Sequence, residues 1–338
     1  MLYDGEKMAK KDLIGVWVRR FLSEYLIGEK NYSSNTQASY RDTLILLLPF
    51  LAKRKRTSID LLAPSKIVAE DIRQFLNYLE KERKCSISTR NQRLAAIHAL
   101  SKFIAGKSPE LITWAQDICS VPFKRSPKPE LAYLEKDEMD AILDAPNSQT
   151  HQGKRDYALL LFLYNTGTRA SEAAQLKISD IRLGGMPSVK IIGKGMKIRY
   201  CPLWSLTVKT LESLIGHRPH HESLFLNCRR QPMTRFGIHS LIHRSAARAS
   251  QSVPSIKEKK IGPHSIRHTT AVHLLRSGVD INTIRAWLGH VSLDTTNIYA
   301  SVDLEMKADA LAHCEIVQKI AKRKGWKSET TMAFLKAL

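Results

Sequence analysis

Apolar side chains recur every three or four residues over four segments of the first 105 residues. This spacing collects them on one face of a helix, so it predicts four amphipathic helices that pack as a small bundle. Ser33 to Asn35 supply N-cap candidates for the second helix, and Ser88 with Thr89 supply them for the fourth. The four predicted helices cover residues 12–27, 36–52, 69–82 and 88–105.

Two arginines of the fourth predicted helix, Arg90 and Arg93, fall off its apolar face in this pattern. Cationic side chains near a helix start can contact phosphates and thereby fix a protein on a nucleic acid. A solvated helix face explains them equally well, so they are candidate DNA contacts rather than an identified surface.

A proline-rich stretch, VPFKRSPKPE at 121–130, follows the bundle. Its composition resists regular structure and predicts an extended connector, with Lys124, Arg125 and Lys128 placed to lie across something anionic. We therefore expect a helical domain over 1–120, a basic linker over 121–131, and a second domain beyond it.

The second part of the chain combines helical periodicity with one β-prone region. SVKIIGKGMKIRYCPL at 188–203 holds two short β-prone runs around a GKG sequence, which predicts a hairpin with Lys194 at its tip. Together these patterns predict a mixed α/β domain over 132–302 and a helical tail over 303–338. Helices are expected in the segments LEKDEMDAILDA and KRDYALLLFLYNTG, and over 205–216, 235–250, 265–277, 280–288 and 303–322.

Charge and cysteine usage narrow the class of protein. Lys and Arg outnumber Asp and Glu by 53 to 32, which gives a formal net charge of +21 and indicates a polyanionic partner, most often a nucleic acid. The longest uncharged apolar run, residues 43–52, is too short to span a bilayer, so we expect no membrane contact and a cytoplasmic location. The five cysteines form no C-x-x-C pair, which argues against a zinc site or a disulfide framework.

The stretch HSIRH places His264 and Arg267 three residues apart, on one helix face. Both side chains can then converge on one oxygen-rich group. A metal site of His264 and His268 is the alternative, but no third ligand is suggested nearby and the Glu of H-E-x-x-H is absent. We assign His268 to packing or support of its neighbours.

Four more residues complete an ordered set. Arg169 follows a Gly-containing turn in NTGTRASEAAQL, and Glu172, three residues later, is able to orient a neighbour. Lys194 lies in GKG. His290 ends the stretch WLGH, and Tyr299 lies in TTNIYASV. The order Arg, Lys, His-x-x-Arg, His, Tyr resembles the tyrosine recombinase (phage integrase) family, firmly over 132–300 and loosely over the bundle. The resemblance implies a mainly α fold with a small β-sheet, made of a SAM-like core-binding bundle and a mixed α/β catalytic domain.

The chemistry explains these residue types. Attack of a tyrosine hydroxyl on a phosphodiester builds extra negative charge on the non-bridging oxygens, so fixed guanidinium groups such as Arg169 and Arg267 are needed there. His264 is the candidate base, because a tyrosine hydroxyl with a pKa near about 10 needs a proton acceptor at neutral pH. The resemblance gives Lys194 the general-acid role, His290 a hydrogen bond to the phosphate, and Tyr299 a covalent bond to the DNA 3′ phosphate.

The resemblance also implies partners and leaves alternatives open. It implies double-stranded DNA, rejoining without ATP, metal or cofactor, and a tetramer of protomers on two duplexes. The apolar stripe of the 303–338 tail is either core of its own domain or, as the resemblance suggests, docks on a neighbouring protomer. Accessory recombination proteins are candidate further partners. The alternatives are a type IB topoisomerase or telomere resolvase, and a noncatalytic DNA-binding accessory protein. The target sequence and the biological task are not set by the sequence.

Overall fold

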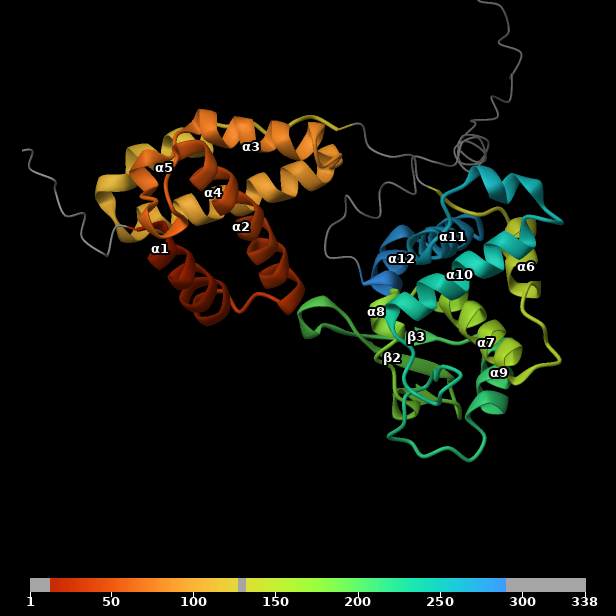
Figure 1. Cartoon of the computed structure of the whole chain (residues 1–338). Coiled ribbons are helices and arrows are strands. Elements are labelled where there is room, and N and C mark those ends of the chain that lie inside the picture. The colour runs from red at the N-terminus through yellow and green to blue at the C-terminus, as the bar shows by residue number, and fades with distance from the viewer. Residues whose placement is uncertain (1–12, 127–131, 290–338) are drawn as a thin grey trace, which may run out of the picture. The chain divides into compact units, whose positions relative to one another are not determined.

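The computed structural model describes residues 13–126 and 132–289, and in the second range no side-chain placement for Lys194. The chain divides into two compact units, one ending at Pro129 and the other beginning at Glu130 (Figure 1). In the described residues the first unit is built of helices, and the second adds a three-stranded sheet to its helices.

The first unit contains all four predicted helices. Their apolar faces meet in one core that includes Phe21, Leu51, Phe75 and Phe103, each almost fully buried. The first predicted helix is in two parts, because α1 (Ile14–Arg20) continues as a π-helix over Phe21–Glu29. The other helices are α2 (Ser34–Lys55), α3 (Ala69–Lys81), α4 (Ile87–Lys107) and α5 (Ile112–Cys119), with 3₁₀ turns at Ile59–Leu61, Pro64–Lys66 and Pro109–Leu111.

The helix starts show one correct cap and one wrong prediction. Ser33 caps α2 by accepting a hydrogen bond from the Thr36 amide, as the sequence predicts. The prediction of Ser88 or Thr89 as the cap of α4 is wrong. Ser86 is the N-cap, and its hydroxyl accepts from the Thr89 amide at 3.2 Å, because the chain already turns helical at Ile87.

The expectation that Arg90 stands off the apolar face of α4 is also wrong. Arg90 is only 6% exposed. Its Nη1 donates to Asn91 Oδ1 at 2.8 Å and to the Pro122 carbonyl at 3.1 Å, and Glu80 lies 3.6 Å from its Nε. These contacts hold the guanidinium inside the unit, although Nε has only the ion pair with Glu80 and no hydrogen bond. Contacts with the start of the connector thus override the helical pattern. Arg93 is partly buried.

The start of the predicted connector lies against the first unit. Residues 122–126 have no regular structure, and Asn91 Nδ2 donates to the Lys124 carbonyl at 2.8 Å. Lys124 Nζ pairs with Glu80 Oε2 at 2.6 Å, whereas Arg125 is exposed. Lys128 lies outside the described residues.

The second unit follows the predicted order of elements. Its helices are α6 (Lys136–Asp144), α7 (His151–Thr166), α8 (Ala170–Ala173), α9 (Ser205–Ile215), α10 (Arg235–Ala249), α11 (Pro263–Arg276) and α12 (Ile281–Leu288). The predicted hairpin is present as β2 (Ser188–Ile192) and β3 (Ile198–Pro202), which pair antiparallel. A two-residue strand that the pattern did not predict, β1 (Ile181–Arg182), completes the sheet in the order β1-β2-β3.

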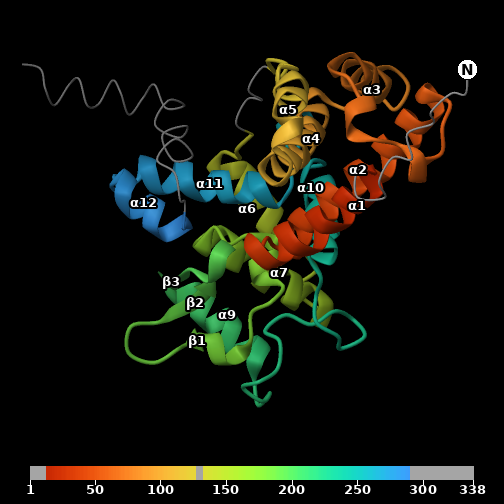
Figure 2. The ribbon, with the colours of Figure 1, turned by 90° about the vertical axis from the view of Figure 1, so that its left-hand side faces the viewer.

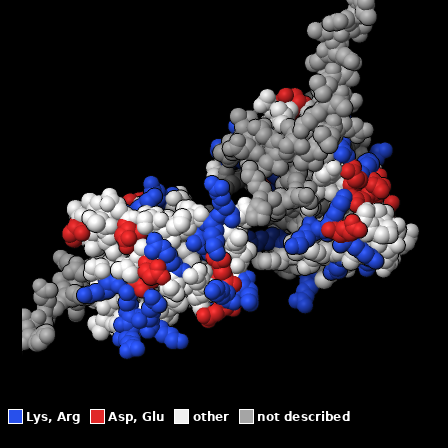
Figure 3. Space-filling model, turned by 90° about the horizontal axis from the view of Figure 1, so that it is seen from above, with Lys and Arg blue, Asp and Glu red and all other residues white. Residues whose placement is uncertain are grey.

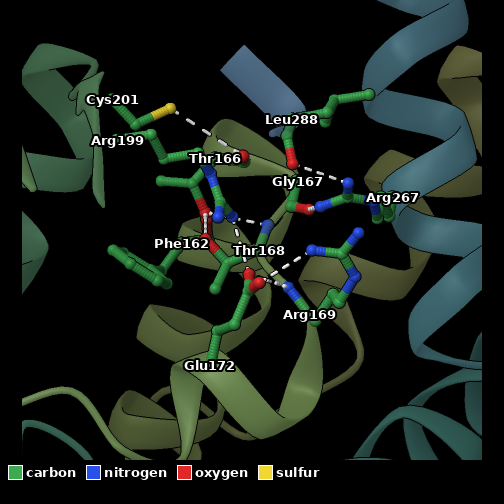
Figure 4. Close-up of polar contacts among 10 residues, drawn as sticks. All are labelled: Phe162, Thr166, Gly167, Thr168, Arg169, Glu172, Arg199, Cys201, Arg267 and Leu288. Carbon is green, nitrogen blue, oxygen red and sulfur yellow. Dashed lines mark hydrogen bonds and ion pairs between the residues drawn. The ribbon is translucent and has the colours of Figure 1, made fainter. Parts of the chain in front are cut away.

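Helix α7 runs through the middle of the second unit. Eleven of its sixteen residues are buried, and it packs against α11 on one side and α9 on another (Figures 1 and 2). The helix ends at Gly167, which adopts a left-handed φ of +58° as the C-cap. This packing brings the end of α7, which leads to Arg169, beside α11, which carries Arg267 (Figure 4).

The fold class is therefore confirmed, since the described chain is mostly helical with one small antiparallel sheet. Among the residues that the structure describes, no helix combines the length and the apolar character that a membrane span requires.

Candidate active site

Arg267 lies in the interior of the second unit, at a helix-to-helix junction. It is 3% exposed, and its guanidinium donates from Nη1 to the Gly167 carbonyl at 2.7 Å and from Nη2 to the Leu288 carbonyl at 2.6 Å (Figure 4). The two carbonyls are the open C-terminal ends of α7 and α12, where the helix dipole is negative and a cation is stabilised. Arg267, which lies on α11, therefore joins the ends of two other helices in a fixed geometry.

Arg169 begins α8, two residues after Gly167. Its amide donates to Glu172 Oε2 at 3.1 Å and its Nη1 donates to Oε1 of the same carboxylate at 2.7 Å. Glu172 is 7% exposed, whereas the Arg169 side chain is 33% exposed. Glu172 thus orients Arg169 from the interior and leaves part of its guanidinium facing outward, which is the neighbour-orienting role that the spacing suggests.

Arg199 is the site residue that the sequence reasoning missed. It comes from β3, and its Nη2 donates to Glu172 Oε2 at 2.6 Å. Its side chain is only 9% exposed, and alternation along β3 places it on the same inward face as the buried Cys201. An arginine at an inward strand position, where an apolar residue is expected, is the sequence signal that could have found it.

The Glu172 carboxylate stays ionised in this surrounding. Burial by itself raises the pKa of Glu172, but hydrogen bonds and positive charge from Arg199 and Arg169 outweigh burial and hold that pKa below its ordinary value. The three side chains together carry two positive charges and one negative charge. A net cation therefore remains at this end of the site.

Two of the three histidines of α11, His264 and His268, are held in their neutral form. Partial desolvation, followed by the charges of Arg267 and Arg169, lowers the pKa of His264. Burial, with the charges of His264 and Arg267, lowers the pKa of His268 to about 4. A neutral imidazole at pH 7 can accept a proton, as a base must. His264 is the exposed member of the pair, and His268 is partly buried.

Three predicted catalytic residues remain, and the structure describes only the backbone of one of them, Lys194. Lys194 opens the turn Lys194–Met196 between β2 and β3, the predicted hairpin tip, where Gly195 has a φ of +73°. His290 and Tyr299 lie outside the described residues. The described part of the chain therefore brings together Arg169, Arg267 and Glu172, places His264 on the same helix as Arg267, and adds Arg199.

Arg169 lies at the border of two open clefts. One, of about 900 Å³, is lined by Lys197, Arg199 and Arg285 and by no acidic residue among those described. The other, of about 410 Å³, is lined by Arg235, Phe236, His239 and His264. Such cationic surroundings suit a phosphate backbone. Lys and Arg are spread over the visible face of each unit rather than gathered in one patch (Figure 3).

The fold and the comparisons with known proteins together define a tyrosine-type, DNA-breaking and rejoining site-specific recombinase. The model of the Phage integrase family matches residues 132–306, and that of the Phage integrase, N-terminal SAM-like domain matches residues 17–109. The chain belongs to the phage integrase family. This membership supports the recombinase prediction over the topoisomerase and accessory-protein alternatives.

Relatives match over most of the chain. It is 35% identical over 307 residues to the putative integrase/recombinase y4rC of Sinorhizobium fredii, covering 90% of this chain and 92% of that protein. It is 30% identical over 288 residues to the tyrosine recombinase XerC of Oceanobacillus iheyensis, covering 82% and 89%.

Solved structures show the same fold. The XerH site-specific recombinase bound to its difH substrate aligns with a TM-score of 0.63 and 21% identity, covering 91% of this chain and 85% of that one. The Tn1549 transposon integrase in complex with transposon right end DNA aligns with a TM-score of 0.66 and 16% identity, covering 88% and 98%.

Proposed function

We propose that the chain cuts one DNA strand at a time by attack of the Tyr299 hydroxyl on a phosphodiester, forming a 3′-phosphotyrosyl bond and a free 5′ hydroxyl. A second 5′ hydroxyl then attacks the phosphotyrosine, releases Tyr299 and rejoins the strands. The energy of the broken bond is kept in the covalent link, so neither ATP nor a metal ion is required. The observation that carries this proposal is the meeting of two arginines, Arg169 and Arg267, around the C-terminal end of α7.

Each site residue has a role in this proposal. Arg169 and Arg267 stabilise the negative charge that builds on the non-bridging oxygens, which suits a guanidinium because its planar fork donates two parallel hydrogen bonds. His264 accepts the Tyr299 proton, and its lowered pKa leaves the imidazole unprotonated at neutral pH, as an acceptor must be. Lys194 protonates the leaving 5′ oxygen, and His290 donates a hydrogen bond to the phosphate.

The assembly belongs to the same proposal. Each of the two units contacts the duplex, and four protomers act on two duplexes, with the tail over 303–338 docking on a neighbour. Support comes from the net charge of +21 and from the DNA-bound states of XerH and the Tn1549 integrase. Because its substrate is DNA, we place the protein in the cytoplasm, with accessory proteins choosing the partner sites.

The test compares the wild-type chain with Tyr299→Phe on nicked duplex fragments that release a short oligonucleotide after cleavage and so trap the covalent product. Wild type is expected to form adducts that survive a denaturing gel, whereas Tyr299→Phe binds the fragments and forms none. Tyr32→Phe, at a residue 37% exposed in the first unit, is the matched control and keeps adduct formation. Sequencing the trapped DNA identifies the target.

Three outcomes contradict the proposal. Adducts formed by Tyr299→Phe would show that another residue is the nucleophile. A tyrosine joined to a 5′ phosphate, with a free 3′ hydroxyl on the other strand end, would reverse the polarity of cleavage. Wild-type chain that binds DNA but forms no adduct on any fragment would favour the accessory-protein alternative, and relaxation of supercoiled plasmid without a preferred sequence would favour a topoisomerase.

A further inference from the structure

One buried carboxylate is shared between two guanidinium groups beside the proposed phosphate site. Glu172 Oε1 accepts from Arg169 Nη1 at 2.7 Å, and Glu172 Oε2 accepts from Arg199 Nη2 at 2.6 Å (Figure 4). The Glu172 and Arg199 side chains are 7% and 9% exposed, so water screens their charges only weakly. Whatever charge Glu172 carries therefore acts strongly on Arg169.

Arg199 determines the net charge of the cluster formed by Arg169, Glu172 and Arg199, beside the proposed phosphate site. With Arg199 present, the three side chains sum to one positive charge. Without it, Glu172 and Arg169 form a neutral pair, and the attraction of Arg169 for a phosphorane-like state is cancelled by the carboxylate behind it. The loss of phosphate attraction would come from the changed charge balance, because the partner of Arg199 is the Glu172 carboxylate.

Arg199 also fills the space between two backbone segments. A Cβ built on Gly193 would lie 3.3 Å from Arg199 Nη1, and one built on Gly289 would lie 3.1 Å from Arg199 Cδ. Both glycines allow the backbone to approach the arginine closely. Gly193 directly precedes Lys194 and Gly289 directly precedes His290 in the sequence, so the Arg199 side chain sets the spacing of the segments that lead to both.

We infer that Arg199 is a positioning residue for strand cleavage, which keeps Arg169 cationic by balancing Glu172 and holds apart the backbone segments that lead to Lys194 and His290. This inference rests on the proposed function, and it gives a role to a residue of β3 outside the ordered set of six. Arg199 is not placed in contact with DNA.

A double-mutant cycle tests the charge balance. Arg199→Met keeps the length of the side chain and removes its charge, and its single-turnover cleavage rate at saturating protein is expected to fall about tenfold or more, on the scale of lost electrostatic stabilisation in other anion sites. DNA affinity is expected to change less than the rate. Adding Glu172→Gln to Arg199→Met removes the charge that neutralises Arg169, and the rate is expected to recover by severalfold.

The controls separate a charge effect from a folding effect. Arg199→Lys restores the charge without the planar fork and is expected to cleave faster than Arg199→Met. Arg182→Met removes an exposed arginine of the same sheet and is expected to leave the rate unchanged. The cooperative unfolding of each variant is measured alongside, so that the rates of folded proteins are compared.

Two results would overturn the inference: a wild-type cleavage rate for Arg199→Met, or a double variant that cleaves no faster than Arg199→Met. If Arg199→Met does not fold, then Arg199→Gln against Glu172→Gln/Arg199→Gln carries the same comparison, because glutamine also removes the charge. Wild-type adducts that depend on Tyr299 keep the proposed function intact whatever the Arg199 variants do, so the two failures are distinguishable.

Discussion

The Arg267 guanidinium donates a hydrogen bond to the Leu288 carbonyl at 2.6 Å, across 21 positions of the chain. Its Nη1 donates a second hydrogen bond to the Gly167 carbonyl at 2.7 Å, 100 positions earlier in the chain. One buried side chain thus holds the ends of α7 and α12 together directly before the segment that begins at His290. An arginine that serves the phosphate in the proposed mechanism is also part of the core of the unit.

Arg267→Lys is expected to destabilise the protein as well as stop cleavage. A lysine ammonium cannot donate to both carbonyls in the fork geometry, so at least one buried carbonyl loses a charged partner, at a cost of about 2–4 kcal/mol in the free energy of unfolding. Urea denaturation of the full chain measures the change. Arg244→Lys, an exposed arginine of α10, should shift the unfolding free energy by less than about 0.5 kcal/mol. Equal stability of the two variants would contradict the structural role.

Gly167→Ala tests the cap of α7. An alanine at a φ of +58° is strained, and its Cβ would lie 2.4 Å from Leu288 Cδ2, so α12 must shift. The expected loss is about 1–3 kcal/mol of unfolding free energy, with slower cleavage because the Leu288 carbonyl moves away from Arg267.

The matched control for Gly167→Ala is Gly278→Ala. Gly278 has a φ of +80° but has no atom within 4 Å of a built Cβ, so this variant carries backbone strain without a clash. The difference between the two variants measures the packing of Leu288 on the cap. If both lose the same stability and Gly167→Ala cleaves normally, then the α7–α12 contact does not support the site.

His268 makes the stability of the protein depend on pH. Its folded-state pKa is lowered to about 4 by burial and neighbouring charge, and an unfolded histidine titrates near about 6.5. The unfolded state therefore binds more protons in this window, so the stabilising contribution is complete above about pH 6.5 and is lost as the pH falls towards 4. His268→Gln should flatten the measured dependence of unfolding free energy on pH. An unchanged slope between pH 6.5 and 4 would show that His268 does not titrate there.

Arg125 and Arg90 are both candidate DNA contacts from the sequence, but they differ in solvent exposure. Arg125 is exposed, so Arg125→Ala should weaken DNA binding and reduce the slope of log affinity against log salt by about 1. Arg90 is 6% exposed and bound inside the first unit, so Arg90→Ala should lower stability and leave the salt slope unchanged. Affinity titrations over a range of salt concentrations give both slopes. A reduced slope for Arg90→Ala would place that residue on the DNA.

Local patterns in the sequence were sufficient for most elements, and they supply the ordered set of residues that predicts the site. Helical periodicity, a Gly-containing turn and two β-prone runs around GKG are short-range signals, and the helices, the cap at Gly167 and the hairpin follow them. The ordered set from Arg169 to Tyr299 identifies the family because each residue type is required by the chemistry at a phosphate.

Only the tertiary structure decided which polar groups are paired in the interior. The helical pattern treats Arg90 as a surface residue, but its guanidinium is buried beside Glu80 and donates to its neighbour Asn91 and to the Pro122 carbonyl, 32 positions later. Arg199 lies on an inward strand position because Glu172, 27 residues earlier, offers a buried carboxylate there. A buried charge needs a partner, and partners distant in sequence become neighbours only when the chain has folded, which is why local patterns do not identify the partners of either arginine.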